Sequence, residues 1–139
     1  MKPKKNLLKI AVLDDSDFYN RIITKQLESY TQGLSIEKNF DFNIESYAHA
    51  DDFIRNLKED IDIAFVDYYL GSGVTGFDIL QVINKKCNHC KVVIISQARN
   101  ELTTIKTLSN GASAFILKDK NALAKTCFFV EHEINKKFT

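Results

Sequence analysis

Five polar residues each stand directly after a short apolar run of the chain. Asp14 and Asp15 follow 9–13, Asp67 follows 61–66, Ser96 follows 92–95, and Lys118 follows 114–117. Three carboxylates brought together repel one another and cannot all stay ionised without a cation. Mg²⁺ prefers oxygen ligands and would resolve that conflict. An aspartate beside such an ion can attack phosphorus and form an acyl phosphate, while an ammonium and a hydroxyl contact the phosphoryl oxygens.

The elements that must position these residues follow from an alternation of apolar runs with longer amphipathic stretches. This alternation predicts an α/β fold with a doubly wound, five-stranded parallel sheet flanked by five helices. The expected strands are 9–13, 42–47, 61–66, 92–95 and 114–117. The expected helices begin after a cap at Ser16 or Asp17, at Asp51–Asp52, and near 77, 101 and 121. Function in such sheets gathers at the carboxyl ends of the strands, so the polar residues should converge on one edge.

The first and last helices each have a predicted buried face. In the first, apolar spacing predicts one buried stripe made of Phe18, Ile22, Ile23, Leu27 and Tyr30. Gly33 is the expected stop of that helix, and 31–41 is expected to be a long loop. In the last, the expected inward face is Leu123, Cys127, Val130 and Ile134.

Length and composition predict one domain over residues 1–139, with a core of about 9–138 and a basic tail at 1–8. A net charge of +1 gives no global attraction to nucleic acid or to an anionic membrane. No apolar segment is long enough for a signal peptide or a membrane span, so we expect a cytoplasmic protein. The chain either works alone or is part of a longer protein with an effector domain.

The three cysteines, Cys87, Cys90 and Cys127, are expected to be reduced thiols. Cys87 and Cys90 flank His89, which places three potential metal ligands close together. A structural zinc site needs four ligands, and no second cluster supplies the fourth, so a thiol-bearing loop is the favoured interpretation. The role of Cys87 and Cys90 stays open.

The full set of polar residues resembles the receiver domains of bacterial two-component response regulators, including the CheY-like ones. The resemblance extends from about Lys9 to Phe138. It implies that Asp67 is phosphorylated by a sensor histidine kinase or a histidine phosphotransfer protein, and that the domain is not an enzyme for external substrates. It also implies that Mg²⁺ is held by Asp14, Asp15, Asp67 and the backbone carbonyl of Tyr69, with Ser96 and Lys118 assisting the transfer.

The resemblance further implies a conformational switch. Ser96 would move toward the phosphoryl group, and Phe115, three residues before Lys118, would change rotamer with it. The surface of the fourth helix, fifth strand and fifth helix would then bind a downstream protein or a second copy of the chain. Departures from the family are the lack of a proline after Asp67, a loop one residue longer before Gly76, and Asp119 where proline is frequent. Ala98 brings no polar group to orient water, which predicts slow self-dephosphorylation.

Three other functions fit the sequence less well. An aspartyl phosphatase usually carries a second aspartate two residues after the nucleophile, where this chain has Tyr69. A flavodoxin-like FMN carrier needs a phosphate loop with little negative charge after the first strand, where this chain has Asp14 and Asp15. A pseudo-receiver, a binding module that works without phosphorylation, would normally have lost one of the five residues.

Overall fold

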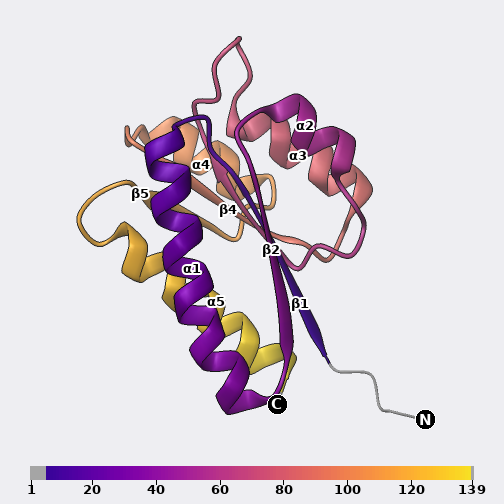
Figure 1. Cartoon of the computed structure of the whole chain (residues 1–139). Coiled ribbons are helices and arrows are strands. Elements are labelled where there is room, and N and C mark those ends of the chain that lie inside the picture. Colours follow the sequence, from indigo (N-terminus) through magenta and orange to yellow (C-terminus); the bar gives the residue numbers. More distant parts are fainter. Residues whose placement is uncertain (1–5, 139) are drawn as a thin grey trace.

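The computed structural model of the protein describes residues 6–138. Within that range the chain forms one five-stranded sheet and five α-helices (Figure 1). The strands are β1 (Leu7–Leu13), β2 (Asp41–Tyr47), β3 (Ile63–Asp67), β4 (Lys91–Ser96) and β5 (Ala114–Leu117). The helices are α1 (Asp17–Lys38), α2 (Ala50–Asn56), α3 (Gly76–Lys86), α4 (Glu101–Ser109) and α5 (Ala122–Lys137). All neighbouring strands are parallel, in the order β2-β1-β3-β4-β5, which confirms the predicted fold class.

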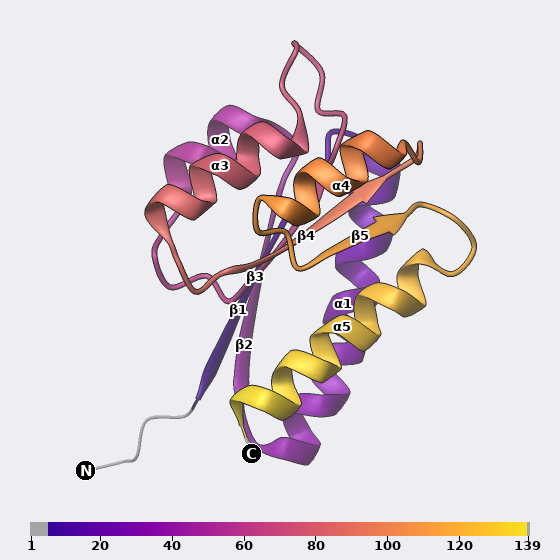
Figure 2. The same cartoon turned by 180° about the vertical axis from the view of Figure 1, so that it is seen from behind.

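Helices cover both faces of the sheet, which explains why its central strands are mostly apolar. In β1, Ile10 and Val12 point to the face covered by α1 and α5, while Ala11 and Leu13 point to the face covered by α2 and α3. α4 lies beside α3 (Figure 2), where Lys106 sits 4.1 Å from the centroid of the Phe77 ring. Buried side chains on both faces therefore hold β1, β3 and β4 in place.

The predicted loop at 31–41 is wrong, because α1 continues through Gly33 to Lys38 and β2 begins at Asp41. Tertiary packing outweighs the low helix propensity of glycine here. Leu34 packs against the core beneath α1 and α5. Phe40, just beyond the helix, is buried and stacks on Phe138 with ring centroids 4.9 Å apart. The helix is therefore held by contacts with the other end of the chain.

Two further predictions need correction. Phe18 is not in the buried stripe of α1, since 75% of its surface is exposed; the buried positions are Asn20, Ile23, Leu27 and Thr31. The strand expected from Lys9 begins at Leu7, so the predicted basic tail 1–8 overlaps β1, and Leu8 is completely buried. The lysine-rich part of that tail, 1–5, lies outside the described residues.

On the last helix, Cys127, Val130 and Ile134 are buried as predicted, and Leu123 is partly buried. Across residues 6–138 no helix is both long enough and apolar enough to span a membrane.

Candidate functional site

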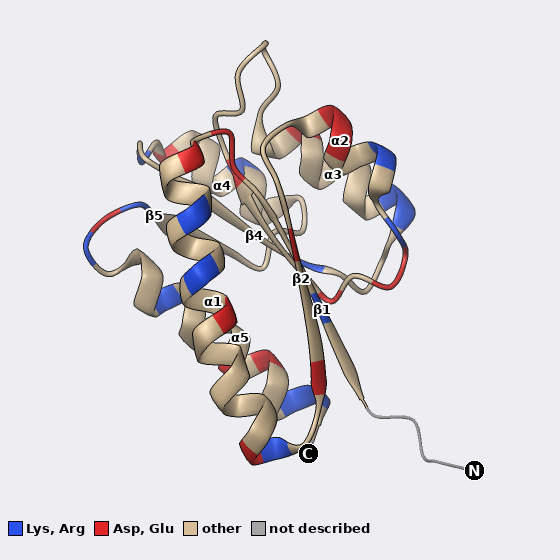
Figure 3. Ribbon diagram, in the orientation of Figure 1, with Lys and Arg blue, Asp and Glu red and all other residues tan. Residues whose placement is uncertain are grey.

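The carboxylates of Asp14, Asp15 and Asp67 meet at the carboxyl ends of β1 and β3. These two strands flank the point where the strand order reverses, which is where ligands bind in sheets of this kind. One carboxylate oxygen from each residue lies within 4.8 Å of the others. Asp14 and Asp67 are buried, whereas Asp15 is exposed. The acidic turn between β1 and α1 is visible in Figure 3. The predicted convergence of the three carboxylates is therefore observed.

Lys118 brings the compensating positive charge from the end of β5. Its ammonium lies 2.9 Å from Asp14 Oδ2 and 3.4 Å from Asp67 Oδ1, and only 4% of its side chain is exposed. Its backbone N–H donates to the Ser96 carbonyl at 2.7 Å, which ties the ends of β4 and β5 together. One buried ammonium thus bridges two of the three carboxylates.

A single lysine does not neutralise this cluster. Burial, followed by the negative charge of Asp14, raises the pKa of Asp67 from 3.8 to about 7, although Lys118 acts in the opposite direction. Without a further cation, ionised Asp67 is therefore unfavourable near neutral pH. A divalent cation would relieve that repulsion, and all three residues offer the oxygen atoms that Mg²⁺ prefers. The donor set fits the metal predicted from the sequence.

The first turn of α1 holds Asp14 in place. Asp14 Oδ1 accepts from the Ser16 backbone N–H at 2.9 Å, and Ser16 caps the helix by accepting from the Tyr19 N–H at 3.3 Å. The Asn20 side-chain amide donates to the Asp14 and Tyr47 carbonyls, both at 2.9 Å. Asn20 was missed from the sequence. Its position three residues before Ile23 places Asn20 on the buried face of α1, and a polar side chain on a buried face was the signal in the sequence.

The loop between β3 and α3 projects beyond the sheet (Figures 1 and 2) and is closed at its base. The Gly76 N–H donates to the Tyr68 carbonyl at 2.7 Å, and the Leu70 N–H donates to the Val74 carbonyl at 3.2 Å. Tyr69 faces Thr75 between these two bonds, so its own carbonyl takes no part in them. The carbonyl predicted as a metal ligand therefore remains outside the hydrogen bonds of this bridge.

Gly76 and Thr75 are also essential to the base of this loop. A Cβ atom at Gly76 would lie 2.9 Å from the Asp67 carbonyl oxygen and 3.0 Å from Tyr68 Cα, so only glycine fits. Thr75 caps α3 in a capping box, accepting from the Asp78 N–H while the Asp78 side chain accepts from the Thr75 N–H. Asp67 is thus followed by a tightly packed turn.

Ser96 stands at the end of β4, one residue beyond Ile95, the strand partner of Asp67. It is fully buried, and its hydroxyl donates to the Ala98 carbonyl at 2.9 Å while accepting from the Ala98 N–H at 3.3 Å. Phe115, on β5, is the strand partner of Ile94 on β4. Its side chain is partly buried against the core beneath α2 and α3. Both predicted switch residues are therefore near the edge that carries the carboxylates, with Ser96 bonded to its own loop.

Comparison with known proteins decides the family. The profile described as response regulator receiver domain matches residues 10–126, which is most of the chain. The chain belongs to the response regulator receiver domain family. No curated protein gave a significant match to the sequence.

Solved receiver domains share the fold. The response regulator domain of Thermotoga maritima CheB is 20% identical with a TM-score of 0.70, over 96% of this chain and 97% of that one. A receiver domain protein from Clostridium thermocellum is 22% identical with a TM-score of 0.74, over 94% and 96%. The isolated receiver domain of Salmonella enterica RcsB, studied with the phosphomimetic BeF3⁻, is 16% identical with a TM-score of 0.73, over 91% and 90%.

Receiver domains are signalling switches that bind Mg²⁺ at an acidic pocket and interact with histidine kinases or phosphotransfer proteins and with effectors. In this chain Asp14, Asp15 and Asp67 form an acidic cluster that could hold a metal ion. The residues that would hold the metal come from the turn after β1 and from the end of β3.

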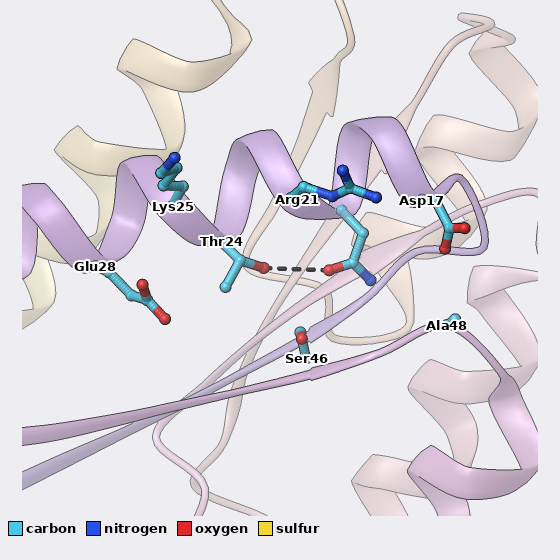
Figure 4. A pocket seen from close by; sticks show the side chains of 8 residues that line it. Asp17, Arg21, Thr24, Lys25, Glu28, Ser46 and Ala48 are labelled. Atoms are coloured by element: carbon cyan, nitrogen blue, oxygen red, sulfur yellow. Dashed lines mark hydrogen bonds between the residues drawn. The ribbon is translucent and has the colours of Figure 1, made fainter.

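Two other features lie apart from this cluster. A polar groove of about 430 Å³ runs between α1 and β2 (Figure 4), and none of the three carboxylates lines it. Its charged residues balance, with Asp17 and Glu28 against Arg21 and Lys25, so it favours no ligand of one sign.

The Cys87 thiol is buried, donates to the Glu59 carbonyl at 3.0 Å and lies 3.6 Å from His89 Nδ1. Burial first, and then the nearby Cys87, raise the pKa of the Cys90 thiol to about 12. Among residues 6–138, the aspartate cluster is the one group of three or more His, Cys, Asp or Glu residues whose ligand atoms all lie within 4.8 Å of one another.

Proposed function

We propose that this receiver domain is a phosphoacceptor switch in which Asp67 receives a phosphoryl group from a histidine kinase or a histidine phosphotransfer protein. The observation that carries the proposal is the buried Asp67 carboxylate, which lies 3.4 Å from the Lys118 ammonium and within 4.8 Å of two other carboxylates. Few structural roles require a charged group in such a place, because burying it costs free energy. Perturbed carboxylates of this kind are typical of functional sites. The domain would act in the cytoplasm, where receiver domains are generally found.

The proposed transfer forms one bond and breaks another. A carboxylate oxygen of Asp67 bonds to phosphorus as the donor's phosphorus–nitrogen bond breaks, and the departing imidazole takes up a proton. With acetyl phosphate the broken bond is phosphorus–oxygen and acetate departs. When bound by Asp14, Asp15, Asp67 and the Tyr69 carbonyl, Mg²⁺ would neutralise charge on the phosphoryl oxygens.

Lys118 and Ser96 have to change partners for this to happen. Lys118 contacts the carboxylate of Asp67 at Oδ1. When that carboxylate carries a phosphoryl group, the ammonium would pass to a phosphoryl oxygen. Ser96 would give up its hydrogen bond to the Ala98 carbonyl and donate to a second phosphoryl oxygen. Phe115 would then move into the space that Ser96 leaves. The Ser96 hydroxyl would exchange one acceptor for another, and the Ala98 N–H and carbonyl that it leaves belong to an exposed residue and can bond to water.

The surface of α4 and α5, which would change its binding partner after phosphorylation, carries exposed apolar side chains. On α4 the only fully buried residue is Thr107, whereas Leu102, Ile105 and Leu108 are 80%, 60% and 43% exposed. Phe128 on α5 is 64% exposed. Apolar side chains gathered on one face mark an interaction surface. We propose that a downstream protein, or a second copy of the domain, binds through α4 and α5 when Asp67 is phosphorylated.

The test is phosphorylation by a small donor. The domain is incubated with acetyl phosphate, with and without Mg²⁺, and its intact mass is followed for the wild type and for Asp67→Asn. We expect the wild type to gain one phosphoryl group only with Mg²⁺, and the variant to gain none. If the wild type gains nothing from acetyl phosphate or from a phosphohistidine donor, the pseudo-receiver becomes the better hypothesis.

A further inference from the structure

The Lys118 ammonium has a third partner besides its two carboxylates. It lies 4.3 Å from the centroid of the Tyr19 ring, while contacting Asp14 Oδ2 at 2.9 Å and Asp67 Oδ1 at 3.4 Å. A cation within about 6 Å of an aromatic face is attracted to it, and the attraction is strongest where water is excluded. With only 4% of its side chain exposed, Lys118 meets that condition.

The ring of Tyr19 is fixed where it is by the start of α1. The Tyr19 backbone N–H donates to the capping hydroxyl of Ser16, and the side chain packs against the core beneath α1 and α5. One residue later, Asn20 anchors the same turn to the carbonyls of Asp14 and Tyr47. The turn that holds Asp14 therefore also holds the aromatic face against Lys118.

Hydrogen bonding by the Tyr19 hydroxyl does not explain why the Tyr19 side chain lies beside Lys118. Among the hydrogen bonds of the described residues, none reaches this hydroxyl oxygen, which is buried. A buried hydroxyl without a partner costs free energy. Burial, followed by the negative charges of Asp14, Asp119 and Asp67, raises the pKa of Tyr19 to about 12. The phenol is therefore neutral at ordinary pH, and its face rather than a phenolate charge meets the ammonium.

We propose that Tyr19 is a positioning residue whose aromatic face keeps the Lys118 ammonium in the site while that ammonium exchanges Asp67 for a phosphoryl oxygen. The ion pair between Lys118 and Asp67 must break during the transfer. Attraction to a ring face does not depend on the direction of a single N–H bond, so it persists while the other partners change. The inference rests on the proposed phosphorylation of Asp67.

The first test compares two substitutions that separate the ring from the hydroxyl. Tyr19→Phe keeps the face, and Tyr19→Met fills the space with a flexible apolar chain that has no face. We expect Tyr19→Phe to be phosphorylated by acetyl phosphate within about twofold of the wild-type rate, and Tyr19→Met to be slower by roughly tenfold. Phe18→Met is the matched control, because Phe18 is the preceding residue on the same helix and is exposed. Its rate should equal that of the wild type.

The second test follows Lys118 without any phosphorylation. An aromatic face shifts the NMR signals of nearby methylene protons upfield, and the Lys118 signals can be assigned by their loss in Lys118→Arg. We expect the shift in the wild type and in Tyr19→Phe, and its loss in Tyr19→Met. Because this test needs no phosphoryl donor, it gives a result even if phosphorylation of Asp67 were disproved.

Three outcomes would overturn the inference while leaving the proposed function standing. The first is a Tyr19→Met rate equal to the wild-type rate. The second is a Tyr19→Phe rate as slow as that of Tyr19→Met, which would assign the effect to the hydroxyl. The third is a Lys118 spectrum that is the same in Tyr19→Met and in the wild type. A wild type that accepts no phosphoryl group would instead refute the proposed function.

Discussion

Replacing Asp67 by asparagine should stabilise the protein when Mg²⁺ is absent. The side chain is 6% exposed, and burial together with the charge of Asp14 raises its pKa from 3.8 to about 7. The folded protein therefore binds this proton more tightly than the unfolded chain does. As pH rises from about 4 to 7, ionisation of Asp67 progressively lowers the free energy of unfolding. Asparagine has nearly the same shape and carries no charge, so it removes this loss.

The size of the effect follows from the pKa. At about 1.36 kcal/mol for each pH unit, the rise of the Asp67 pKa corresponds to an upper limit of roughly 4 kcal/mol at pH 7 and above. Lys118 keeps its 2.9 Å contact with Asp14 in the variant, so no unpaired buried ammonium is created. Water entering the site reduces the gain, and we expect about 2–3 kcal/mol at pH 7.5, falling to about 1 kcal/mol near pH 5.

Urea unfolding followed by circular dichroism measures this difference. Wild type and Asp67→Asn are compared in EDTA at several pH values, with Asp51→Asn, an acidic residue in the first turn of α2, as the control that should gain nothing. Adding Mg²⁺ should shrink the difference, because the metal stabilises only the protein that binds it. A variant no more stable than the wild type in EDTA, or a gain that does not fall with pH, would refute the reasoning.

Other predictions concern the turn after Asp67 and the lifetime of the phosphorylated state. Gly76→Ala should lower the free energy of unfolding by roughly 1–3 kcal/mol, because its Cβ would lie 2.9 Å from the Asp67 carbonyl oxygen. The control Gly33→Ala, which meets nothing within 4 Å inside α1, should raise it by up to about 1 kcal/mol; equal urea midpoints would contradict both. Thr75→Ala should cost about 1 kcal/mol in the same assay by removing the cap of α3, and an unchanged midpoint would show that the cap is dispensable. Ala98→Asn should shorten the half-life of the phosphorylated protein severalfold by supplying a polar group that orients water; an equal or longer half-life, measured by intact mass after donor removal, would end the prediction of slow self-dephosphorylation.

The convergence of Asp14, Asp15, Asp67, Ser96 and Lys118 on one edge could be predicted from the sequence for a simple geometric reason. Parallel strands put all their carboxyl ends on the same edge, so naming the strands was enough to gather the residues that follow them. The strands themselves were clear because burial on both faces demands continuous apolar runs such as Val92–Ile95.

The errors came from features that only three-dimensional packing decides. Asn20 and Thr31 are polar but lie on the buried face of α1. A buried face predicted from apolar residues alone therefore leaves them out and wrongly includes Phe18. The last turns of α1 pack against a core cluster that includes Phe138, near the opposite end of the chain. Likewise, no spacing in the sequence places the ring of Tyr19 against Lys118.

The central claim is that Asp67 itself becomes the acyl phosphate, and chemical mapping tests it most directly. Borohydride reduces an aspartyl phosphate to homoserine, so the protein is treated with acetyl phosphate and Mg²⁺, reduced, digested and sequenced by mass spectrometry. The account predicts homoserine at position 67 alone, and none when Mg²⁺ is replaced by EDTA. Homoserine at Asp14 or Asp15 would contradict it, as would homoserine at no position of the folded, Mg²⁺-bound protein after treatment with acetyl phosphate and, separately, with a phosphohistidine donor.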